Sequence, residues 1–207
     1  MQLILDDCLP RLRSMPDKSI DLVLTDPPYG IRHARSRGAN SIFRPFTPKS
    51  WDSAIPTTEL FHEVLRVGRR HIIWGGNYYA HILPPTNGWL VWYKRDGLPP
   101  LQYSDCELAW TSCETKSKVF NCRHHGGVKD SKETLVPHPT QKALEVMKWC
   151  IELFSKSGET ILDPFLGSGT SGVAAKLLGR KFIGIERDPE YMSIASKRIA
   201  LAHLDVI

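Results

Sequence analysis

A run of one acidic residue, two prolines and a tyrosine is the first candidate for chemistry in this sequence. The run is Asp26-Pro27-Pro28-Tyr29, and it follows Ile20–Thr25, whose apolar residues predict a buried strand. Two consecutive prolines fix the backbone and leave the carbonyl groups of Asp26 and Pro27 without the usual strand partners. A carboxylate and a rigid carbonyl could then accept both N–H bonds of one amino group, while the ring stacks on a base. A strand-ending turn is the alternative interpretation.

A glycine-rich run is the second candidate. Asp163-Pro164-Phe165 leads from the predicted strand Thr160–Leu162 into Gly167-Ser168-Gly169-Thr170, with Gly172 two residues further on and Glu186 after the next strand. This spacing matches the dinucleotide fingerprint, so a nicotinamide-dependent oxidoreductase is a competing hypothesis. Glycines let the backbone approach a ligand, and an acid at the next strand end can bind ribose hydroxyls. The inserted Asp163 favours a cofactor with a cationic centre, because a carboxylate repels pyrophosphate.

The elements that must position these residues alternate between strands and helices. Such alternation predicts an α/β fold with a doubly wound, mainly parallel, seven-stranded sheet, in which ligands bind at the carboxyl ends of the strands. The predicted strands are Gln2–Leu5, Ile20–Thr25, His71–Trp74, Trp89–Tyr93, Glu107–Thr111, Thr160–Leu162 and Phe182–Ile185. The predicted helices are Thr57–Val67, one capped by Thr140 and ending at Phe154, Thr170–Leu178, and one that starts at Asp188-Pro189.

The basic charge is concentrated in two segments whose apolar residues follow neither the period of a strand nor that of a helix. The chain has 207 residues and a net charge of +5, and its length predicts a single domain over residues 1–207. Residues 30–56 and 112–137 are predicted as long loops, and together they hold more net positive charge than the whole chain, so the remainder is net acidic. The segments are either solvated loops or a surface that contacts phosphate groups. Phe43, Phe46 and Trp51 either pin the first segment to the body or stack on bases.

These motifs resemble those of the S-adenosylmethionine-dependent DNA methyltransferases that modify an exocyclic amine. The tetrapeptide Asp26–Tyr29 is similar to the catalytic motif of the family, and Asp163–Thr170 is similar to its cofactor loop. His138-Pro139-Thr140-Gln141-Lys142 resembles the segment that precedes this loop, and Leu5–Leu9 resembles the element that meets the adenine of the cofactor. The catalytic motif comes before the cofactor loop, as in the beta class, which is a circular permutation of the Rossmann-like methyltransferase fold. Asp6 replaces a common Gly, and Ala143 replaces a common Pro.

The resemblance implies a role for each matched residue. The Asp26 carboxylate and the Pro27 carbonyl would accept the two N–H bonds of the target amine, with Pro28 fixing the backbone and Tyr29 stacking on a flipped-out base. Asp7 would bind the adenine of the cofactor and Glu186 its ribose, while Thr140 and Lys142 would lie near its methionine carboxylate; a helix cap and a surface lysine are the plainer alternatives for the last two. The cofactor-binding set is Asp7, Cys8, Thr140, Lys142, Asp163, Phe165, Gly167, Ser168, Gly169, Thr170 and Glu186.

The implied function is transfer of a methyl group from S-adenosylmethionine to N6 of adenine in double-stranded DNA. Cytosine-N4 methylation is the alternative, although that group more often carries Ser at the position of Asp26. Methylation of a cytosine ring carbon is excluded, because that family's nucleophilic cysteine follows a proline and no cysteine here does. A DNA-binding relic without activity would leave the intact tetrapeptide unexplained. The residues expected to contact DNA are Arg32, Arg35, Arg37, Arg44, Lys116, Lys118 and Arg123.

Composition and analogy give the remaining expectations. The five scattered cysteines are expected to be free thiols in a reducing cytoplasm, and no apolar run or leader pattern predicts a membrane location. We expect no metal site, because Cys113, Cys122, His124 and His125 fit no familiar zinc spacing. By analogy with the family, a homodimer and a place in a restriction–modification system are expected, with no cognate restriction nuclease identified.

Overall fold

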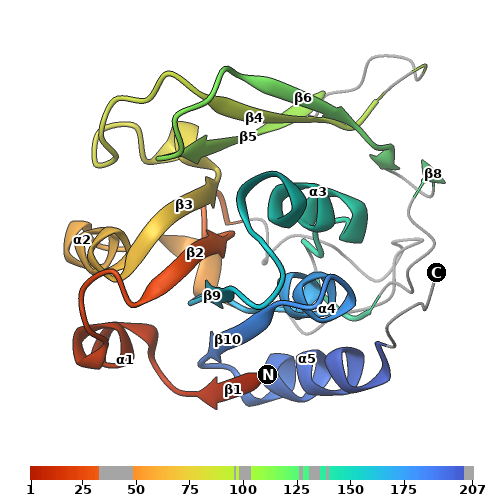
Figure 1. The fold of residues 1–207 in the computed structure, drawn as a ribbon. Coiled ribbons are helices and arrows are strands. Elements are labelled where there is room, and N and C mark those ends of the chain that lie inside the picture. Colours follow the sequence, from red (N-terminus) through yellow and green to blue (C-terminus); the bar gives the residue numbers. More distant parts are fainter. Residues whose placement is uncertain are drawn as a thin grey trace.

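A computed structural model describes residues 1–32, 49–95, 97, 104–125, 128–130, 136–138 and 140–202, and the statements below concern these residues. They form an α/β structure around an eight-stranded sheet with the strand order β1-β10-β9-β2-β3-β5-β4-β6 (Figure 1). The strands are β1 Gln2–Leu5, β2 Ile20–Thr25, β3 Gly68–Trp74, β4 Trp89–Tyr93, β5 Cys106–Thr111, β6 Lys118–Asn121, β9 Thr160–Asp163 and β10 Lys181–Glu186. Two short strands, β7 His124–His125 and β8 Val128–Lys129, pair separately.

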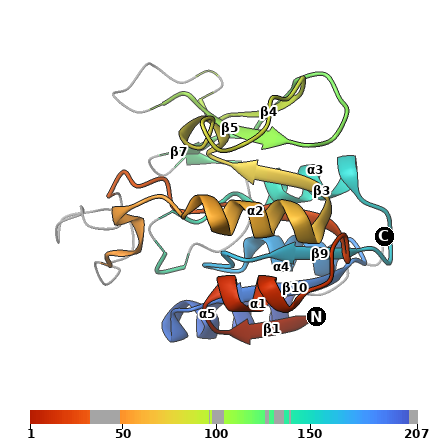
Figure 2. The ribbon, with the colours of Figure 1, turned by 90° about the vertical axis from the view of Figure 1, so that its left-hand side faces the viewer.

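The five neighbouring strands β1, β10, β9, β2 and β3 run parallel to one another. Strand β5 runs antiparallel to both β3 and β4. The helices are α1 Cys8–Ser14, α2 Thr58–Val67, α3 Leu144–Phe154, α4 Thr170–Leu177 and α5 Pro189–Leu201, with single turns η2 Trp51–Ser53 and η3 Gly76–Tyr78. Figures 1 and 2 show α1 and α2 on one face of the sheet and α3, α4 and α5 on the other. Among the described residues, no helix is long and apolar enough to cross a membrane.

Burial on both faces explains why the central strands are continuously apolar. In β2, Leu22 and Leu24 pack into the core beneath α3 and α4, whereas Val23 between them packs into the core beneath α1 and α2. Neighbouring residues of a strand point to opposite faces, so a sheet covered twice needs an apolar side chain at every position.

The topological switch point lies between β2 and β9. From β2 the chain passes through α2 to β3 on one side, and from β9 it passes through α4 to β10 on the other side, with α2 and α4 on opposite faces. Ligands of doubly wound sheets bind where two such connections diverge. The hydroxyl of Thr25, the last residue of β2, donates to Asp163 Oδ1 at the end of β9 over 2.7 Å. Both candidate motifs therefore begin side by side at this point.

The predicted strands and helices are confirmed, with three corrections. The sheet has eight strands rather than seven, because Lys118–Asn121 in the segment predicted as a loop forms the edge strand β6, of which only Phe120 is partly buried. Thr140 does not cap a helix: α3 begins at Leu144 after an extended Ala143 that makes no side-chain cap. The short helix α1 was not predicted, because it buries only Cys8 and Leu12 and so shows no apolar stripe.

Candidate active site

The tetrapeptide Asp26–Tyr29 leaves the end of β2 and lies against a turn, Gly75–Tyr79, that leaves the end of β3. The buried Tyr79 hydroxyl lies 2.9 Å from the Pro27 carbonyl oxygen and 2.7 Å from that of Pro28, and it donates to them. The two prolines supply no backbone N–H of their own, so this hydroxyl fixes their carbonyl groups from outside the motif. One lone pair of the Pro27 carbonyl remains for another donor.

Asp26 belongs to a chain of alternating charges. Lys142 Nζ lies 2.9 Å from Asp26 Oδ2 and 2.5 Å from Glu107 Oε2, and Lys94 Nζ lies 3.0 Å from Glu107 Oε1. The Lys142 side chain is only 7% exposed. Because a buried charge is costly unless it is paired, these four groups depend on one another. We call Asp26–Tyr29, Gly75–Tyr79, Glu107 and Lys142 the catalytic corner.

Burial and pairing shift the acid–base equilibria of this chain in different directions. Burial raises the pKa of Asp26, and the Lys142 cation opposes that rise. Burial alone would raise the pKa of Glu107, but Lys142 and Lys94 lower it to about 2. Burial disfavours the Lys142 ammonium, yet the carboxylates of Asp26 and Glu107 raise the pKa of Lys142. Lys142 is therefore a permanent cation that stabilises an ionised Asp26.

Tyr29 is bound at both its hydroxyl and its ring. Its hydroxyl donates to Asp26 Oδ1 over 2.6 Å and accepts from Lys142 Nζ over 3.0 Å. Burial and the neighbouring Asp26 carboxylate raise the pKa of Tyr29 well above the ordinary value for a phenol, so the hydroxyl keeps its proton. Its ring stacks on that of Tyr78, with the centroids 4.8 Å apart and the planes inclined by 16°.

Two carboxylates, the buried Asp163 and the partly buried Glu186, hold the glycine loop, Asp163–Thr170. Asp163 is 2% exposed and accepts three hydrogen bonds, from the Thr25 hydroxyl, the Phe165 backbone N–H and, over 2.5 Å, the Ser171 hydroxyl. Burial raises the pKa of Asp163 to about 6. At the end of β10, Glu186 accepts from the backbone N–H groups of Gly167 and Asp188, over 2.8 and 2.9 Å. Burial raises the pKa of Glu186 as well. The two carboxylates thus fix the path of the loop.

Two glycines of this loop adopt the left-handed backbone conformation. Gly167 has φ +51° and Gly169 has φ +82°, and a Cβ at Gly169 would lie 2.8 Å from Ala195 Cβ in α5. Gly169 therefore serves both a left-handed turn and a close approach between two helices. The flanking Ser168 and Thr170 are buried beside Arg198, whose Nη1 donates to the Ser168 carbonyl over 2.6 Å and to Thr170 Oγ1 over 3.0 Å.

The other predicted cofactor residues lie near the same carboxyl ends of the strands. Asp7 follows β1 and caps α1, accepting from the Leu9 backbone N–H over 2.9 Å. Burial raises the pKa of Cys8 to about 12, so its thiol is neutral. Phe165 packs on the core beneath α1 and α2. The Thr140 backbone N–H donates to His138 Nδ1 over 3.3 Å. Lys142 points instead at Asp26, which brings it into the catalytic corner.

The predicted DNA-contacting residues differ in their environment. Arg32, Lys116 and Lys118 are exposed. Arg123 forms an ion pair with Asp130 over 2.9 Å. Arg35, Arg37 and Arg44 lie outside the described residues, as do Phe43 and Phe46 of the same segment. The Trp51 ring stacks on His138 with the centroids 6.1 Å apart, which favours the pinning interpretation for this one aromatic residue.

Sequence reasoning missed Glu107 and the whole turn Gly75–Tyr79, with its two tyrosines Tyr78 and Tyr79, as parts of the catalytic corner. Glu107 was recognised only as part of a weak strand. The tyrosines stand in Gly75-Gly76-Asn77-Tyr78-Tyr79, directly after the predicted strand His71–Trp74. A double glycine after a buried strand, followed by two aromatic residues, is a signal that could have identified this turn.

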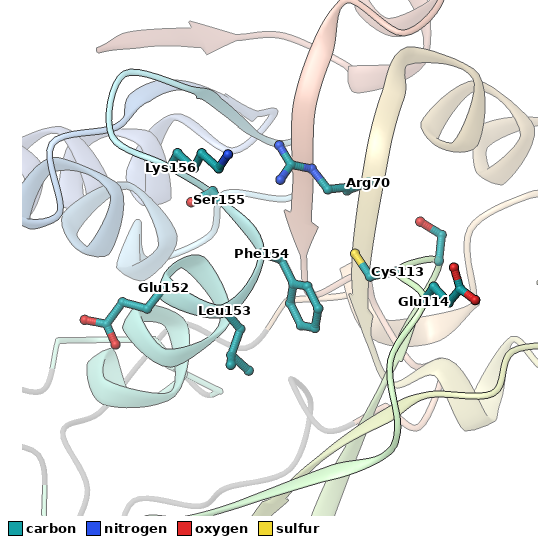
Figure 3. Close-up of a pocket in the computed structure, with 9 residues that line it drawn as sticks. Arg70, Cys113, Glu114, Glu152, Leu153, Phe154, Ser155 and Lys156 are labelled. Carbon is teal, nitrogen blue, oxygen red and sulfur yellow. The ribbon is translucent and has the colours of Figure 1, made fainter.

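A cavity of about 480 Å³ lies away from this site (Figure 3). Its lining residues come from the start of β3, the segment after β5 and the end of α3, so it lies at the ends of the strands opposite to the tetrapeptide. Among them are Arg70, Cys113, Glu114, Phe154 and Lys156. Arg70 is already paired with Glu159 over 2.7 Å. Within the described residues, no group of three or more His, Cys, Asp or Glu side chains is arranged to hold a metal ion.

Comparison with known proteins assigns the family. A family model described as DNA methylase, of the N6/N4 type, matches residues 83–197, which is more than half of the chain. The chain belongs to this DNA methylase family. The family consists of DNA methyltransferases that modify exocyclic amines, and its methyl donor is S-adenosylmethionine. Family membership replaces the nicotinamide-dependent hypothesis for the glycine loop.

Two relatives resemble the methylase over most of its length. Type II methyltransferase M.HinfI from Haemophilus influenzae is 27% identical over 239 residues, and the alignment covers 93% of this chain. The chain spans 66% of M.HinfI, just under two thirds of its length. Type II methyltransferase M2.MboI from Moraxella bovis is also 27% identical, with 93% of this chain and 85% of the relative covered.

Solved structures show the same fold. The M1.HpyAVI–SAM complex superposes with a TM-score of 0.64 at 24% identity, covering 97% of this chain and 99% of the other. The PvuII DNA methyltransferase, described as cytosine-N4-specific, superposes with a TM-score of 0.65 at 16% identity, covering 99% and 87% of the two chains. These likenesses confirm the Rossmann-like methyltransferase architecture predicted from the sequence.

Proposed function

We propose that this methylase transfers the methyl group of S-adenosylmethionine to N6 of an adenine that is flipped out of double-stranded DNA. The observation that carries the proposal is the position of Asp26. Its carboxylate lies at the switch point of the sheet, 2.9 Å from the buried Lys142 cation and next to the fixed Pro27 carbonyl. Asp rather than Ser at this position supports adenine, and cytosine-N4 methylation is the second candidate because it uses the same geometry.

The glycine loop suits the cofactor. Glu186 accepts from two backbone N–H groups and keeps lone pairs for ribose hydroxyls, and the left-handed Gly167 and Gly169 carry no side chain that would block a ligand from the loop backbone. Phe165, Gly167, Ser168, Gly169 and Thr170 would line the cofactor, with Asp7 near its adenine, Cys8 beside Asp7, and Thr140 near its methionine carboxylate. We assign Lys142 to the catalytic corner because it is bonded to Asp26, Glu107 and Tyr29.

The corner would activate an amine that is a poor nucleophile, because its lone pair is delocalised into the base. The Asp26 carboxylate and the free lone pair of the Pro27 carbonyl would accept the two N–H bonds and direct the nitrogen lone pair toward the methyl group. Lys142 holds Asp26 Oδ2, so the amine would reach Oδ1 by displacing the Tyr29 hydroxyl. The Tyr29 ring would stack on the base.

The bound cofactor supplies a methyl group on a positively charged sulfur. As the nitrogen–carbon bond forms, the sulfur–carbon bond breaks and the sulfur keeps the electron pair. The nitrogen becomes cationic and must lose one proton. Asp26 is placed to take it, because burial raises the pKa of its carboxyl group. Lys142 remains protonated throughout, and the proton then passes from Asp26 to water.

We further propose that the basic segments, residues 30–56 and 112–137, contact DNA phosphates. Arg32, Lys116 and Lys118 are exposed and available for this role, and Arg35, Arg37 and Arg44 are proposed from the sequence. Arg123 would contribute less because Asp130 neutralises it. Membership of the beta class, a single domain, a homodimer and a restriction–modification role remain proposals from the resemblance.

The test is to incubate the protein with unmethylated DNA and labelled S-adenosylmethionine, digest the DNA to nucleosides and identify the product by mass. We expect N6-methyladenine. Asp26→Ala should abolish incorporation while S-adenosylmethionine still binds, and Asp17→Ala, a 75% exposed aspartate, is the matched control. Finding only N4-methylcytosine would show that the target base is cytosine rather than adenine. Labelling of RNA or protein without labelling of DNA would overturn the proposal.

A further inference from the structure

The turn Gly75–Tyr79 forms a second wall of the catalytic corner. It follows β3, the neighbour of β2 in the sheet, and backbone hydrogen bonds hold it, among them the Gly75 N–H to the Leu108 carbonyl and the Tyr78 N–H to the Gly75 carbonyl, both 2.8 Å. Gly75 has φ +71°, and a Cβ there would collide with the Tyr29 ring. The turn thus brings its backbone against the side chain that is proposed to receive the base.

The two tyrosines of this turn lie in different environments. Tyr79 is fully buried and bonded to the two proline carbonyls, so it is part of the framework. Tyr78 is 39% exposed, and its ring covers the Tyr29 ring in a nearly parallel stack. A large aromatic side chain at the surface, lying on the catalytic tyrosine, has no role in the framework.

A flipped base could not stack on the outside of Tyr78 and still react. The Tyr29 hydroxyl lies in the plane of its own ring and touches Asp26 Oδ1 over 2.6 Å, so the acceptor lies near that plane. Each stacked ring adds a layer of about 3.5 Å, the contact distance between carbon atoms. A base outside Tyr78 would lie about two layers, or about 7 Å, from the plane, whereas a hydrogen bond spans about 3 Å. On this face of Tyr29, the reacting base must therefore occupy the layer that Tyr78 fills.

We propose that Tyr78 occupies the position of the target base in the free protein. It covers the face of Tyr29 and moves out of this position when the flipped base binds. The inference rests on the proposed function, since it takes the flipped base to be the substrate of the corner. Tyr78 is a positioning residue in this scheme. It keeps the Tyr29 ring and hydroxyl in place, and it covers the ring face that would otherwise be exposed to water.

The experiment compares Tyr78→Ala, Tyr78→Leu and Tyr78→Phe with the wild-type protein. The methylated position is first mapped, and an oligonucleotide with 2-aminopurine at that position then reports flipping by its fluorescence. Losing one aromatic pair from the free state should lower KM for DNA and Kd for the oligonucleotide by about two- to ten-fold in Tyr78→Ala, a larger change than the change in kcat. Tyr78→Phe keeps the ring and should match the wild type, and Tyr78→Leu should lie between them.

The opposite result would overturn the inference. If Tyr78 stays in place and stacks on the bound base, Tyr78→Ala should raise KM and lower the 2-aminopurine fluorescence at saturation. Unchanged KM and Kd in Tyr78→Ala would also overturn it. S-adenosylmethionine affinity checks that each variant is folded, and Tyr78→Leu carries the test if Tyr78→Ala is not. Wild-type protein that neither methylates DNA nor flips the base would show that the proposed function, rather than the exchange, is wrong.

Discussion

The catalytic corner and the glycine loop begin side by side at the ends of β2 and β9, but different kinds of contact hold them. The corner joins side chains from four distant segments through charges and aromatic rings, with Lys142 between Asp26 and Glu107 as its centre. The glycine loop is held mainly by carboxylates that accept from backbone N–H groups and hydroxyls, with Asp163 and Glu186 as its fixed points.

This difference predicts two different sensitivities. A change of charge should disrupt the corner, because its buried groups balance one another, and should leave the loop intact. A change of backbone conformation should disrupt the loop, because its path depends on left-handed glycines. Substitutions that separate the two effects test whether the corner serves catalysis and the loop serves the cofactor.

Lys142→Met should have the largest effect on the corner. It leaves two partly buried carboxylates without their shared cation, so we expect stability to fall by about 3 kcal/mol and kcat by about 100-fold or more. S-adenosylmethionine affinity should change less than about two-fold, because no charge of the loop is altered. Urea unfolding, calorimetric cofactor titration and methyl incorporation measure the three quantities. A large loss of cofactor affinity with normal kcat would place Lys142 in the cofactor site instead.

The pH dependence of kcat tests the charges of the catalytic corner independently of the glycine loop. Catalysis needs an ionised Asp26, so kcat should fall as the pH drops through the pKa of Asp26. Lys142→Met removes an attraction and should move this fall to higher pH, whereas Glu107→Gln removes a repulsion and should move it to lower pH. Shifts in the same direction for both variants would contradict the charge chain.

Asp163 should make the stability of the loop region depend on pH. Burial raises its pKa in the folded protein to about 6, above the ordinary value of 3.8, so the folded state binds the proton more tightly than the unfolded state. Its contribution is therefore full below pH 3.8 and is lost as the pH rises through about 6. Relative to Asp163→Asn, the wild type should lose about 2–3 kcal/mol over this range. Urea unfolding of both proteins across these pH values checks the sign, and parallel curves would refute it.

The contrast also explains how far sequence reasoning could reach. Asp163, Gly167, Gly169 and Glu186 form a local pattern, because a loop held by its own backbone must keep its spacing. The seven strands were predictable for a similar reason, since burial on two faces makes them continuously apolar. Only part of the catalytic corner, the tetrapeptide Asp26–Tyr29, could be predicted as a site. Glu107 is linked to Asp26 through the ammonium group of Lys142, and no spacing in the chain encodes such a contact. Edge strand β6 was missed because an edge buries too little to leave a pattern.

Gly169→Ala should disrupt the loop and spare the corner. The new Cβ meets Ala195 Cβ at 2.8 Å, and the left-handed backbone adds about 1–2 kcal/mol of strain. Gly158→Ala is the matched control, because its φ is +81° and its Cβ would meet nothing within 4 Å. Both variants should lose thermal stability, but only Gly169→Ala should weaken S-adenosylmethionine binding, by about ten-fold, as α5 is pushed away. Equal cofactor affinity in the two variants would remove the loop from the cofactor site.

The basic surface should give the smallest effect, because exposed charges act through solvent. Replacing both Lys116 and Lys118 by Ala removes two cations near the edge strand β6, and Lys181→Ala removes, as a control, an exposed lysine at the start of β10, which is six strands away from β6 in the sheet order. If the first pair contacts phosphates, the slope of log K against log salt should fall in magnitude by up to about 1.8, with cofactor affinity unchanged. Fluorescence anisotropy between low and moderate salt measures this slope. An unchanged slope would assign these lysines to a solvated surface, and the net charge of the segment would then reflect solubility rather than DNA binding.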